Sequence, residues 1–299
     1  MDLTTNYLGF TLKSPLVAAS CSLTGSPESA RKLEDAGFAA LVARSIFEED
    51  LSRIGDSHLA NLRAIREAVS IPVVASVNCR THASWGAFAK AIEDTGVSAL
   101  ELNLYDIPDD AAEPSAQIEA RQIDLVRQVV ASTRLPVAVK ISPYYTALIP
   151  FCRGLQAAGA RGIVIFNRFM QPDINTETSH LRYNVNFSSS NDLRLPLRWT
   201  AILREQLTID IALTGGVHTA DDAIQAILVG ATVVCPCSVL YLRPNDNPVG
   251  EILTGLRAWL ARKGQQQVSE FRGSMRTTGF GSRTGFERAH YVKTLGGVK

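Results

Sequence analysis

Residues 211–238, IALTGGVHTADDAIQAILVGATVVCPCS, contain a strand, a glycine turn, a helix and a second strand in succession. The apolar run Ile211–Leu213 predicts a buried strand, and Thr219 followed three residues later by Asp222 resembles the capping box that begins a helix. Paired glycines after a strand allow backbone N–H groups to approach an anion closely. Gly215–Gly216 therefore predicts either an anion site or a tight turn, because two glycines alone are a weak motif.

A weak internal repeat indicates that similar helix–strand units follow one another along the chain. The segments EDAGFAALVA, EDTGVSALEL, QAAGARGIVI and LVGATVV each contain a helix end, a glycine and then an apolar strand. The glycine is expected to end its helix in the left-handed conformation. Short apolar runs predict eight strands, at Leu16–Ala19, Ala40–Ala43, Val73–Val77, Ala99–Leu102, Val137–Ile141, Ile163–Phe166, Ile211–Leu213 and Thr232–Val234.

The predicted strands are continuous apolar runs, which is typical of a parallel sheet buried on both faces. Eight strand–helix units predict an α/β fold, a closed (β/α)8 TIM barrel, which we expect to span residues 1–264. The alternative is a Rossmann-like open sheet, which is disfavoured because no GxGxxG follows the first strand. Helices are expected at Pro27–Ala36, His58–Val69, Ser84–Thr95, Ser115–Thr133, Ala147–Ala158, Pro196–Glu205, Thr219–Val229 and Pro248–Arg262.

Two features are expected outside the barrel. The long connection after the sixth strand alternates Tyr183, Val185 and Phe187 with polar residues, which predicts a small hairpin lid over the barrel mouth. The C-terminal tail, residues 265–299, is rich in glycine and arginine. Its aromatic residues predict that the tail packs on the barrel or on a partner subunit.

Composition narrows the class of protein. The 299 residues are 46% hydrophobic and 20% charged, with a net charge of +1, so no strong field favours nucleic acid or a membrane surface. The first residues, MDLTTNYLGF, do not resemble a signal peptide, which favours the cytoplasm. Five cysteines without disulfide or metal spacing predict free thiols and no metal site.

Polar residues at the ends of the predicted strands indicate the chemistry, because catalytic residues in such barrels lie there. They include three asparagines and one lysine but no pair of carboxylates, which disfavours glycoside hydrolysis and metal-assisted hydrolysis. Asparagine amides both donate and accept hydrogen bonds, so they suit a heterocycle such as a flavin or a pyrimidine. The strand-end residues are Ala19, Ser20, Cys21, Arg44, Ser45, Asn78, Cys79, Asn103, Lys140, Asn167, Gly215, Gly216, Cys237 and Ser238.

The segments SPLVAAS, ELNL, LPVAVKISPYY, FNR and LTGGVHTADDAIQAILVGATVV, in this order, resemble the class 1 dihydroorotate dehydrogenase family of FMN-dependent barrels. The similarity runs from Leu3 to about Leu260, and the segments ERAHYVKTL and LRLPLRW are more similar to a divergent dihydroorotate dehydrogenase-like branch. The resemblance implies FMN as cofactor, a small carbonyl-containing substrate, oxidation or reduction of a CH–CH bond, and a homodimer. A separate redox partner protein is a further possibility, since the chain has no second cofactor motif.

The resemblance also implies roles for individual residues. Lys140 would hold the flavin near N1 and O2, with a lysine paired inside the barrel as the alternative, and Asn103, Asn167 and Arg168 would contact substrate. Arg44 replaces the family's usual lysine, which keeps the charge but not the shape, and Cys237 replaces a glycine in the phosphate site. The implied cofactor residues are Ala19, Ser20, Arg44, Ser45, Asn78, Asn103, Lys140, Asn167, Gly215, Gly216, Cys237 and Ser238.

The chain departs from the family on the substrate side. The family's loop after the fourth strand reads ELNLSCPN and carries the catalytic base, whereas this chain reads ELNLYDIPDD. Asp106 stands at the base position and Tyr105 precedes it, so either could move the proton, unless Asp106 only caps the loop and Tyr105 only covers the flavin. Lys140 would take part in catalysis by stabilising negative charge on the reduced flavin. The segment between Arg44 and His58 is shorter than the family's substrate loop.

The cysteines at strand ends leave two interpretations. Cys21, Cys79 or Cys237 could be a thiol donor displaced from the usual loop, or small residues packed near the cofactor; the second is favoured because no cation is predicted beside Cys21. For the whole chain we expect a dihydroorotate dehydrogenase-like oxidoreductase whose substrate differs from dihydroorotate. The alternatives are a true dihydroorotate dehydrogenase, a non-catalytic flavin subunit of a redox complex, and a phosphate-sugar enzyme without flavin.

Overall fold

The structure is a computed structural model that describes residues 1–78, 85–105, 107–168, 172–182, 186–275, 291–292 and 295–296. Its centre is a barrel of eight parallel strands that hydrogen-bond in chain order. The barrel closes where Leu16 bridges Val234 and the Val234 N–H donates to the Pro15 carbonyl at 2.8 Å. The predicted TIM barrel is therefore confirmed, and the open sheet is excluded. The strands are β3 (Val17–Ala18), β4 (Ala40–Val42), β6 (Val73–Asn78), β7 (Ala99–Asn103), β8 (Val137–Ile141), β9 (Gly162–Ile165), β12 (Asp210–Thr214) and β13 (Val233–Cys235).

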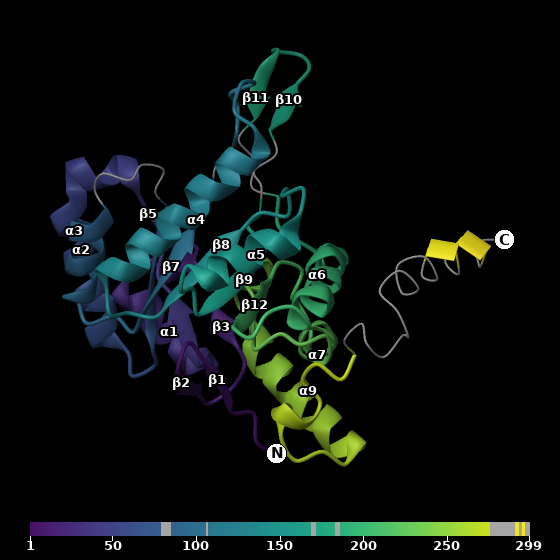
Figure 1. Ribbon diagram of the computed structural model, residues 1–299. Coiled ribbons are helices and arrows are strands. Elements are labelled where there is room, and N and C mark those ends of the chain that lie inside the picture. The colour runs from purple at the N-terminus through teal and green to yellow at the C-terminus, as the bar shows by residue number, and fades with distance from the viewer. Residues whose placement is uncertain are drawn as a thin grey trace.

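Helices surround the barrel (Figure 1). Each of the eight predicted helices has a counterpart in the structure. The short helix α8 (Ser238–Leu242) was not predicted, because its sequence was interpreted as a turn. The other helices are α1 (Pro27–Ala36), α2 (Glu48–Ala68), α3 (Trp85–Glu93), α4 (Ser115–Ser132), α5 (Leu148–Ala157), α6 (Arg194–Arg204), α7 (Ala220–Leu228) and α9 (Pro248–Lys263).

The start of α2 corrects one prediction. The chain forms the short strand β5 (Ile46–Phe47) and enters the helix at Glu48, well before the predicted start at His58. The prediction of a loop over residues 46–57 is therefore wrong. Gly55 lies inside this helix, where one glycine costs only about 1 kcal/mol, which the other helical turns offset.

A hairpin that was not predicted closes the barrel at the amino-terminal ends of its strands, which we call the lower end; the carboxyl ends form the upper end. Strands β1 (Thr5–Tyr7) and β2 (Phe10–Leu12) pair antiparallel, and the Leu8 N–H donates to Asp210 Oδ2 at 2.8 Å. Tyr7 is 4% exposed and packs in one cluster with small residues of the barrel wall such as Ala99 and Ala138. Small wall residues leave room for the hairpin, so the lower end of the barrel interior is filled with side chains.

The internal repeat has a structural basis at this lower end. Gly37, Gly96, Gly159 and Gly230 have φ values of 113°, 81°, 101° and 114°, so the predicted left-handed helix ends are confirmed. Three residues before the first three of these glycines stand Glu34, Glu93 and Gln156. Each side chain accepts a hydrogen bond from the backbone of the next helix–strand loop, at Ser70, Arg134 and Thr208 respectively. We call these three contacts the loop clasps.

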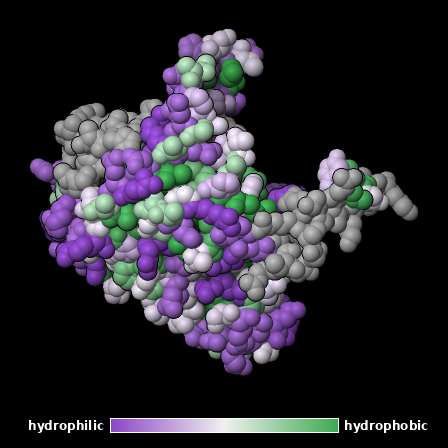
Figure 2. Space-filling view, in the orientation of Figure 1, coloured by the Kyte–Doolittle hydropathy of each residue, from purple (hydrophilic) through white to green (hydrophobic). Residues whose placement is uncertain are grey.

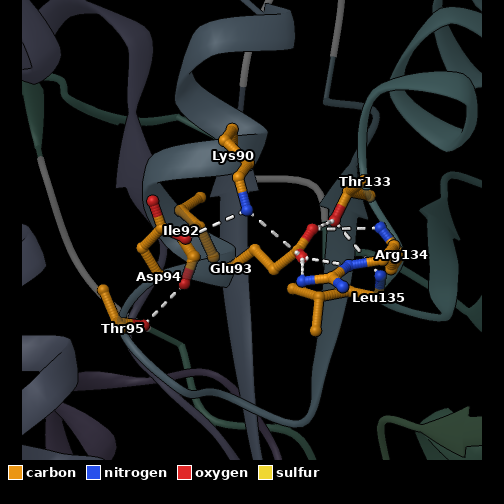
Figure 3. A network of polar contacts seen from close by, with 8 residues as sticks. All are labelled: Lys90, Ile92, Glu93, Asp94, Thr95, Thr133, Arg134 and Leu135. Carbon is orange, nitrogen blue, oxygen red and sulfur yellow. Dashed lines mark hydrogen bonds and ion pairs between the residues drawn. The ribbon is translucent and has the colours of Figure 1, made fainter.

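The Glu93 clasp makes the most contacts (Figure 3). Its carboxylate accepts from Thr133 Oγ1 at 2.9 Å, the Arg134 N–H at 3.0 Å and Arg134 Nε at 2.7 Å, while Lys90 Nζ lies 3.4 Å away. The hydrogen bonds from Arg134 and Thr133 lower the Glu93 pKa to about 2. This clasp ties the end of α3 to the loop that leads into β8.

In the fourth repeat, the C-terminal tail makes the corresponding contact. The Gly273 N–H donates to the Ile227 carbonyl at 2.9 Å, three residues before Gly230. Phe271 is 1% exposed and packs on Trp259, with 4.6 Å between ring centroids. Residues 265–275 therefore pack on the barrel near α9, and most of the tail beyond them lies outside the described residues.

The connection after β9 carries a hairpin, β10 (Asp173–Asn175) and β11 (His180–Arg182). It projects away from the barrel instead of lying flat over it (Figure 1). Tyr183 and Val185, on which the prediction depended, lie outside the described residues, and Phe187 is not in a strand. Figure 2 shows hydrophobic atoms among hydrophilic ones on this projection, where Ile174 and Leu181 pair while 60% and 52% exposed.

No helix in the described ranges is long and apolar enough to cross a membrane.

Candidate active site

A cavity of about 350 Å³ opens at the carboxyl ends of the barrel strands. Its size falls within the usual range for small-molecule sites, roughly 300–1,000 Å³. Several predicted site residues line it, from the ends of β3, β8, β9, β12 and β13. These are Ala19, Ser20, Lys140, Asn167, Arg168, Gly215, Gly216, Cys237 and Ser238.

One end of the cavity is formed by the glycine turn after β12. Gly215 and Gly216 have φ values of 92° and 75°, in the left-handed region that favours glycine. A Cβ on Gly216 would lie 2.3 Å from the Leu193 nitrogen, whereas one on Gly215 would meet nothing within 4 Å. Gly216 is therefore required by the close approach of Leu193, and Gly215 faces open space.

Serine hydroxyls surround this turn. Ser188 Oγ accepts from the Gly216 N–H at 3.3 Å and donates to Ser238 Oγ at 2.9 Å. Asp222 points away and caps α7, because its Oδ2 accepts from the His218 and Thr219 N–H groups, both at 2.9 Å. The expectation that Asp222 caps the helix is confirmed. This end of the cavity is lined by N–H and O–H groups and by Asp192, whose carboxylate accepts hydrogen bonds from Ser189.

The other end holds Lys140 and the buried Glu101. Lys140 Nζ lies 3.8 Å from Glu101 Oε1, and the two side chains are 12% and 4% exposed. Glu101 Oε1 has no hydrogen-bond partner among the described residues. Burial raises the Glu101 pKa, although Lys140 and a hydrogen bond from Ser76 act in the opposite direction. Lys140 is therefore paired inside the barrel and also lines the cavity, and its contact with a flavin stays a prediction.

A chain of hydroxyl groups links Glu101 to the cavity wall. Ser20 Oγ lies 3.1 Å from Ser45 Oγ, which lies 2.7 Å from Ser76 Oγ. Ser76 hydrogen-bonds Glu101. Ser20 lines the cavity, so this chain runs beneath it from β3 to β7. Ser45 therefore supports Ser20 and does not line the cavity itself.

The three predicted asparagines lie together. Asn167 donates from Nδ2 to Asn103 Oδ1, and Asn78 Nδ2 donates to the Asn103 carbonyl at 2.9 Å. Of the three, Asn167 lines the cavity. Asn103 therefore orients the Asn167 amide, and Asn78 holds the backbone of Asn103.

The remaining predicted residues lie elsewhere. Arg44 and Ser45 line a second cavity of about 300 Å³ with His58 and Asn61, so Arg44 and Arg168 do not share a cavity. Tyr105 follows β7 but does not line the main cavity, and its carbonyl lies 3.5 Å from Asn78 Nδ2. Asp106 and Cys79 lie outside the described residues.

Sequence reasoning missed residues of two kinds. Glu101 and Ser76 point inward from the middle of strands; an acid within the apolar run ALELN was the available signal. The others lie in loops, above all the β9–α6 connection, and at the start of α6, which no strand-end rule covers, while Thr214 is the last residue of β12. They are Pro143, Tyr144, Phe166, Ser188, Asp192, Leu195, Pro196, Thr214 and Val217.

Two cysteines lie in contact near the glycine turn. Cys237 lines the cavity and hydrogen-bonds to Cys21, which follows β3. Cys152 and Cys235 are buried, and burial raises the pKa of each to about 12. Among the described residues, no group of three or more His, Cys, Asp or Glu side chains could hold a metal ion.

Comparison with known proteins gives one consistent family. The family model for dihydroorotate dehydrogenase matches residues 51–260. The putative dihydroorotate dehydrogenase A (fumarate) of Aeropyrum pernix is 27% identical in an alignment 299 positions long, gaps included, which covers 91% of this chain and 97% of the relative. The dihydroorotate dehydrogenase B (NAD(+)) catalytic subunit of Desulforudis audaxviator is 26% identical in an alignment 298 positions long, which covers 91% of this chain and 96% of the relative. The family model covers more than half of the chain, and the chain belongs to the class 1 dihydroorotate dehydrogenase family.

Proposed function

We propose that this chain is an FMN-dependent oxidoreductase that acts on a CH–CH bond beside a carbonyl group. The observation that carries the proposal is the lining of the main cavity. N–H and O–H donors of Gly216, Ser188 and Ser238 gather at one end, and the cation of Lys140 lies among the remaining lining residues. A phosphate suits the first end, and the anionic edge of a reduced flavin suits Lys140.

The residues of the cavity fit this cofactor. Gly215 faces open space on the cavity side, so its backbone N–H can be approached closely. With Gly216, Cys237 and Ser238 it would hold the phosphate. Ala19, Ser20 and Lys140 would hold the ring, and Asn167 would lie between ring and substrate. When bound, FMN supplies the acceptor for a hydride.

Lys140 stabilises negative charge in this scheme. Lys140 Nζ lies 3.8 Å from Glu101 Oε1 and also lines the cavity, so its charge can act on a bound anion as well. The Ser20–Ser45–Ser76 hydroxyl chain connects this carboxyl to the cavity wall without charge. The chain's own residues thus provide a cation that is largely buried, where electrostatic stabilisation is stronger than in water.

We infer that the substrate differs from dihydroorotate. The family resemblance implies a proton-transfer group on the loop after β7, where this chain has Tyr105 and Asp106 instead of the expected Cys or Ser. Helix α2 also begins where the family has a substrate loop. Arg168 lines the cavity and suits a substrate carboxylate. Asp106 would accept the proton, as carboxylates are ionised at neutral pH.

The alternative is dihydroorotate oxidation with Asp106 or Tyr105 as a substituted base. The names of the relatives from Aeropyrum pernix and Desulforudis audaxviator favour it. Anaerobic stopped-flow mixing of the flavin-loaded chain with dihydroorotate separates the two. We expect no bleaching of the flavin absorbance on the time scale of turnover; fast bleaching establishes the alternative and overturns our substrate inference.

Cofactor binding has its own test. We expect FMN titrated into flavin-stripped protein to lose fluorescence in a saturable manner and to protect the chain against thermal unfolding. Riboflavin, which lacks the phosphate, should bind more weakly because it cannot use the Gly215–Gly216 end. Equal affinity for the two compounds would contradict the phosphate assignment.

A role as one subunit of a redox complex is a second candidate. The relative from Desulforudis audaxviator is named a catalytic subunit, which implies a partner for that protein. The same could hold here, since the chain carries no motif for a second cofactor. From the family resemblance we also propose a homodimer, a cytoplasmic location and a barrel unit that ends near residue 264. Turnover of the isolated chain with small electron acceptors would remove the need for a partner.

A further inference from the structure

Two thiols meet where the barrel closes. Cys21 follows β3, Cys237 follows β13, and these strands are neighbours across the Leu16–Val234 bridge. The thiol of Cys237 hydrogen-bonds the sulfur of Cys21, and neither is in a disulfide. Both are partly exposed, and Cys237 lines the main cavity. The pair is therefore within reach of small molecules.

The surroundings of the two sulfur atoms differ. Besides Cys237, the hydroxyl of Tyr241 and the backbone N–H groups of Leu23 and Thr24 donate hydrogen bonds to the Cys21 sulfur. Tyr241 is itself fixed, with its hydroxyl 2.6 Å from Ser22 Oγ. A sulfur that accepts several hydrogen bonds is stabilised as a thiolate.

The pKa of Cys21 is accordingly lowered to about 6, first by the hydrogen bond from Cys237 and then by the other donors. The pKa of Cys237 is raised, because its proton is held by Cys21 and the side chain is largely buried. We assign the thiolate to Cys21, since Tyr241 and two N–H groups bond to its sulfur and not to that of Cys237. The pair thus combines an attacking thiolate with a neighbouring protonated thiol.

We propose that Cys21 and Cys237 form a redox-active dithiol that small disulfides oxidise to an internal disulfide. The Cys21 thiolate attacks one sulfur of the small disulfide, whose S–S bond breaks and releases one half as a thiolate. That thiolate takes the proton of Cys237, directly or through water. Cys237 then attacks the Cys21 sulfur and releases the second half. Two electrons pass from the protein to one disulfide, which becomes two small thiols.

Oxidation would act on the cavity directly. The disulfide would join the end of β3 to the segment just before Ser238, beside the glycine turn. The hydrogen bond between Cys237 and Cys21 would be replaced by a covalent S–S bond, at the end of the cavity that suits an anion. We argue this inference from the two thiols, one of which, Cys237, also belongs to the proposed phosphate site.

The test uses glutathione disulfide on the full chain at pH 6, followed by an acid quench, intact-mass measurement and peptide mapping. The native chain should lose two hydrogens and yield a linked Cys21–Cys237 peptide. Cys237→Ser should stop at one glutathione adduct on Cys21. Cys21→Ser should react at Cys237 about tenfold more slowly, because an ordinary thiol holds little thiolate at this pH.

Two results would overturn the proposal. One is a native chain that accumulates a stable adduct on Cys21 without the linked peptide, which would mean that Cys237 cannot reach it. The other is a Cys21→Ser variant that reacts as fast as the native chain. Cys237→Ala serves as a second variant if Cys237→Ser does not fold, and Cys152, being buried, is the internal unreactive control.

Discussion

The two ends of the barrel are built from the same repeat but treat polar groups in opposite ways. At the lower end, Glu34, Glu93 and Gln156 bind the following loops and the N-terminal hairpin fills the interior. At the upper end, a buried carboxylate oxygen of Glu101 has no hydrogen-bond partner among the described residues, beside a cavity. Satisfied polar groups stabilise a fold, whereas an unsatisfied one costs free energy that function must explain. In TIM barrels the upper end carries the chemistry and the lower end the stability.

The largest expected effect is at the upper end. Lys140→Met should lower the rate of flavin reduction by about 10²–10³-fold, the usual cost of removing one group that stabilises developing charge. It should also make the bound flavin harder to reduce, measured as a more negative midpoint potential by dye equilibration. Lys140→Arg, which keeps the charge, is the control. If the flavin in Lys140→Met kept the midpoint potential of the native chain, Lys140 would not act on the cofactor.

Gly216→Ala should come next, with FMN affinity reduced by about 100-fold, or about 2.7 kcal/mol. The new Cβ would lie 2.3 Å from the Leu193 nitrogen, so the turn must move. Gly264→Ala is the matched control, because its φ of 68° is similarly positive, its Cβ meets nothing within 4 Å, and it lies at the end of α9 and does not line the cavity. Fluorescence titration with FMN measures both. Equal losses in the two variants would show that backbone strain matters and the close approach does not.

Glu93→Gln tests the lower end and should leave FMN affinity unchanged. The melting temperature at pH 7 should fall by a few degrees, because Thr133 and Arg134 lose a charged acceptor. Thermal unfolding measured by circular dichroism provides the readout. A loss of FMN binding without a loss of stability would contradict the assignment of cofactor binding to the upper end and of stability to the lower end.

The pH dependence of this clasp is a smaller effect. The Glu93 pKa is lowered to about 2 in the folded chain, so the carboxylate stabilises the fold above the ordinary carboxyl pKa of about 4.3. That contribution is lost as pH falls from there toward 2. The difference in melting temperature between the native chain and Glu93→Gln should therefore shrink as pH is lowered below about 4. A difference that stays constant would mean that charge is not its origin.

The sequence predicted what local patterns control. Apolar runs and the glycines at Gly37, Gly96, Gly159 and Gly230 located the strands and helix ends, since both signals lie within a few residues. The hairpin around Tyr7 was not predicted, because its burial depends on small wall residues far along the chain. The early start of α2 was missed because the segment before His58 was interpreted as a shortened substrate loop.

The part of the site that lies at strand ends was predicted, because strand ends can be located from local patterns. Lys140, Asn167, Gly215 and Ser238 line the cavity because a closed barrel brings the strand ends together. Ser188 and Asp192 reach it from a long loop whose path no periodicity encodes. Arg44 follows a strand, as predicted, but lines the second cavity, because the side-chain direction after a strand end depends on the loop.

The most direct test of the central claim is the visible absorption spectrum of the freshly purified chain, followed by heat denaturation. We predict the two absorption bands of an oxidised flavin, and release of a yellow compound whose mass is that of FMN. A colourless protein that also fails to take up added FMN would contradict the assignment of the upper cavity.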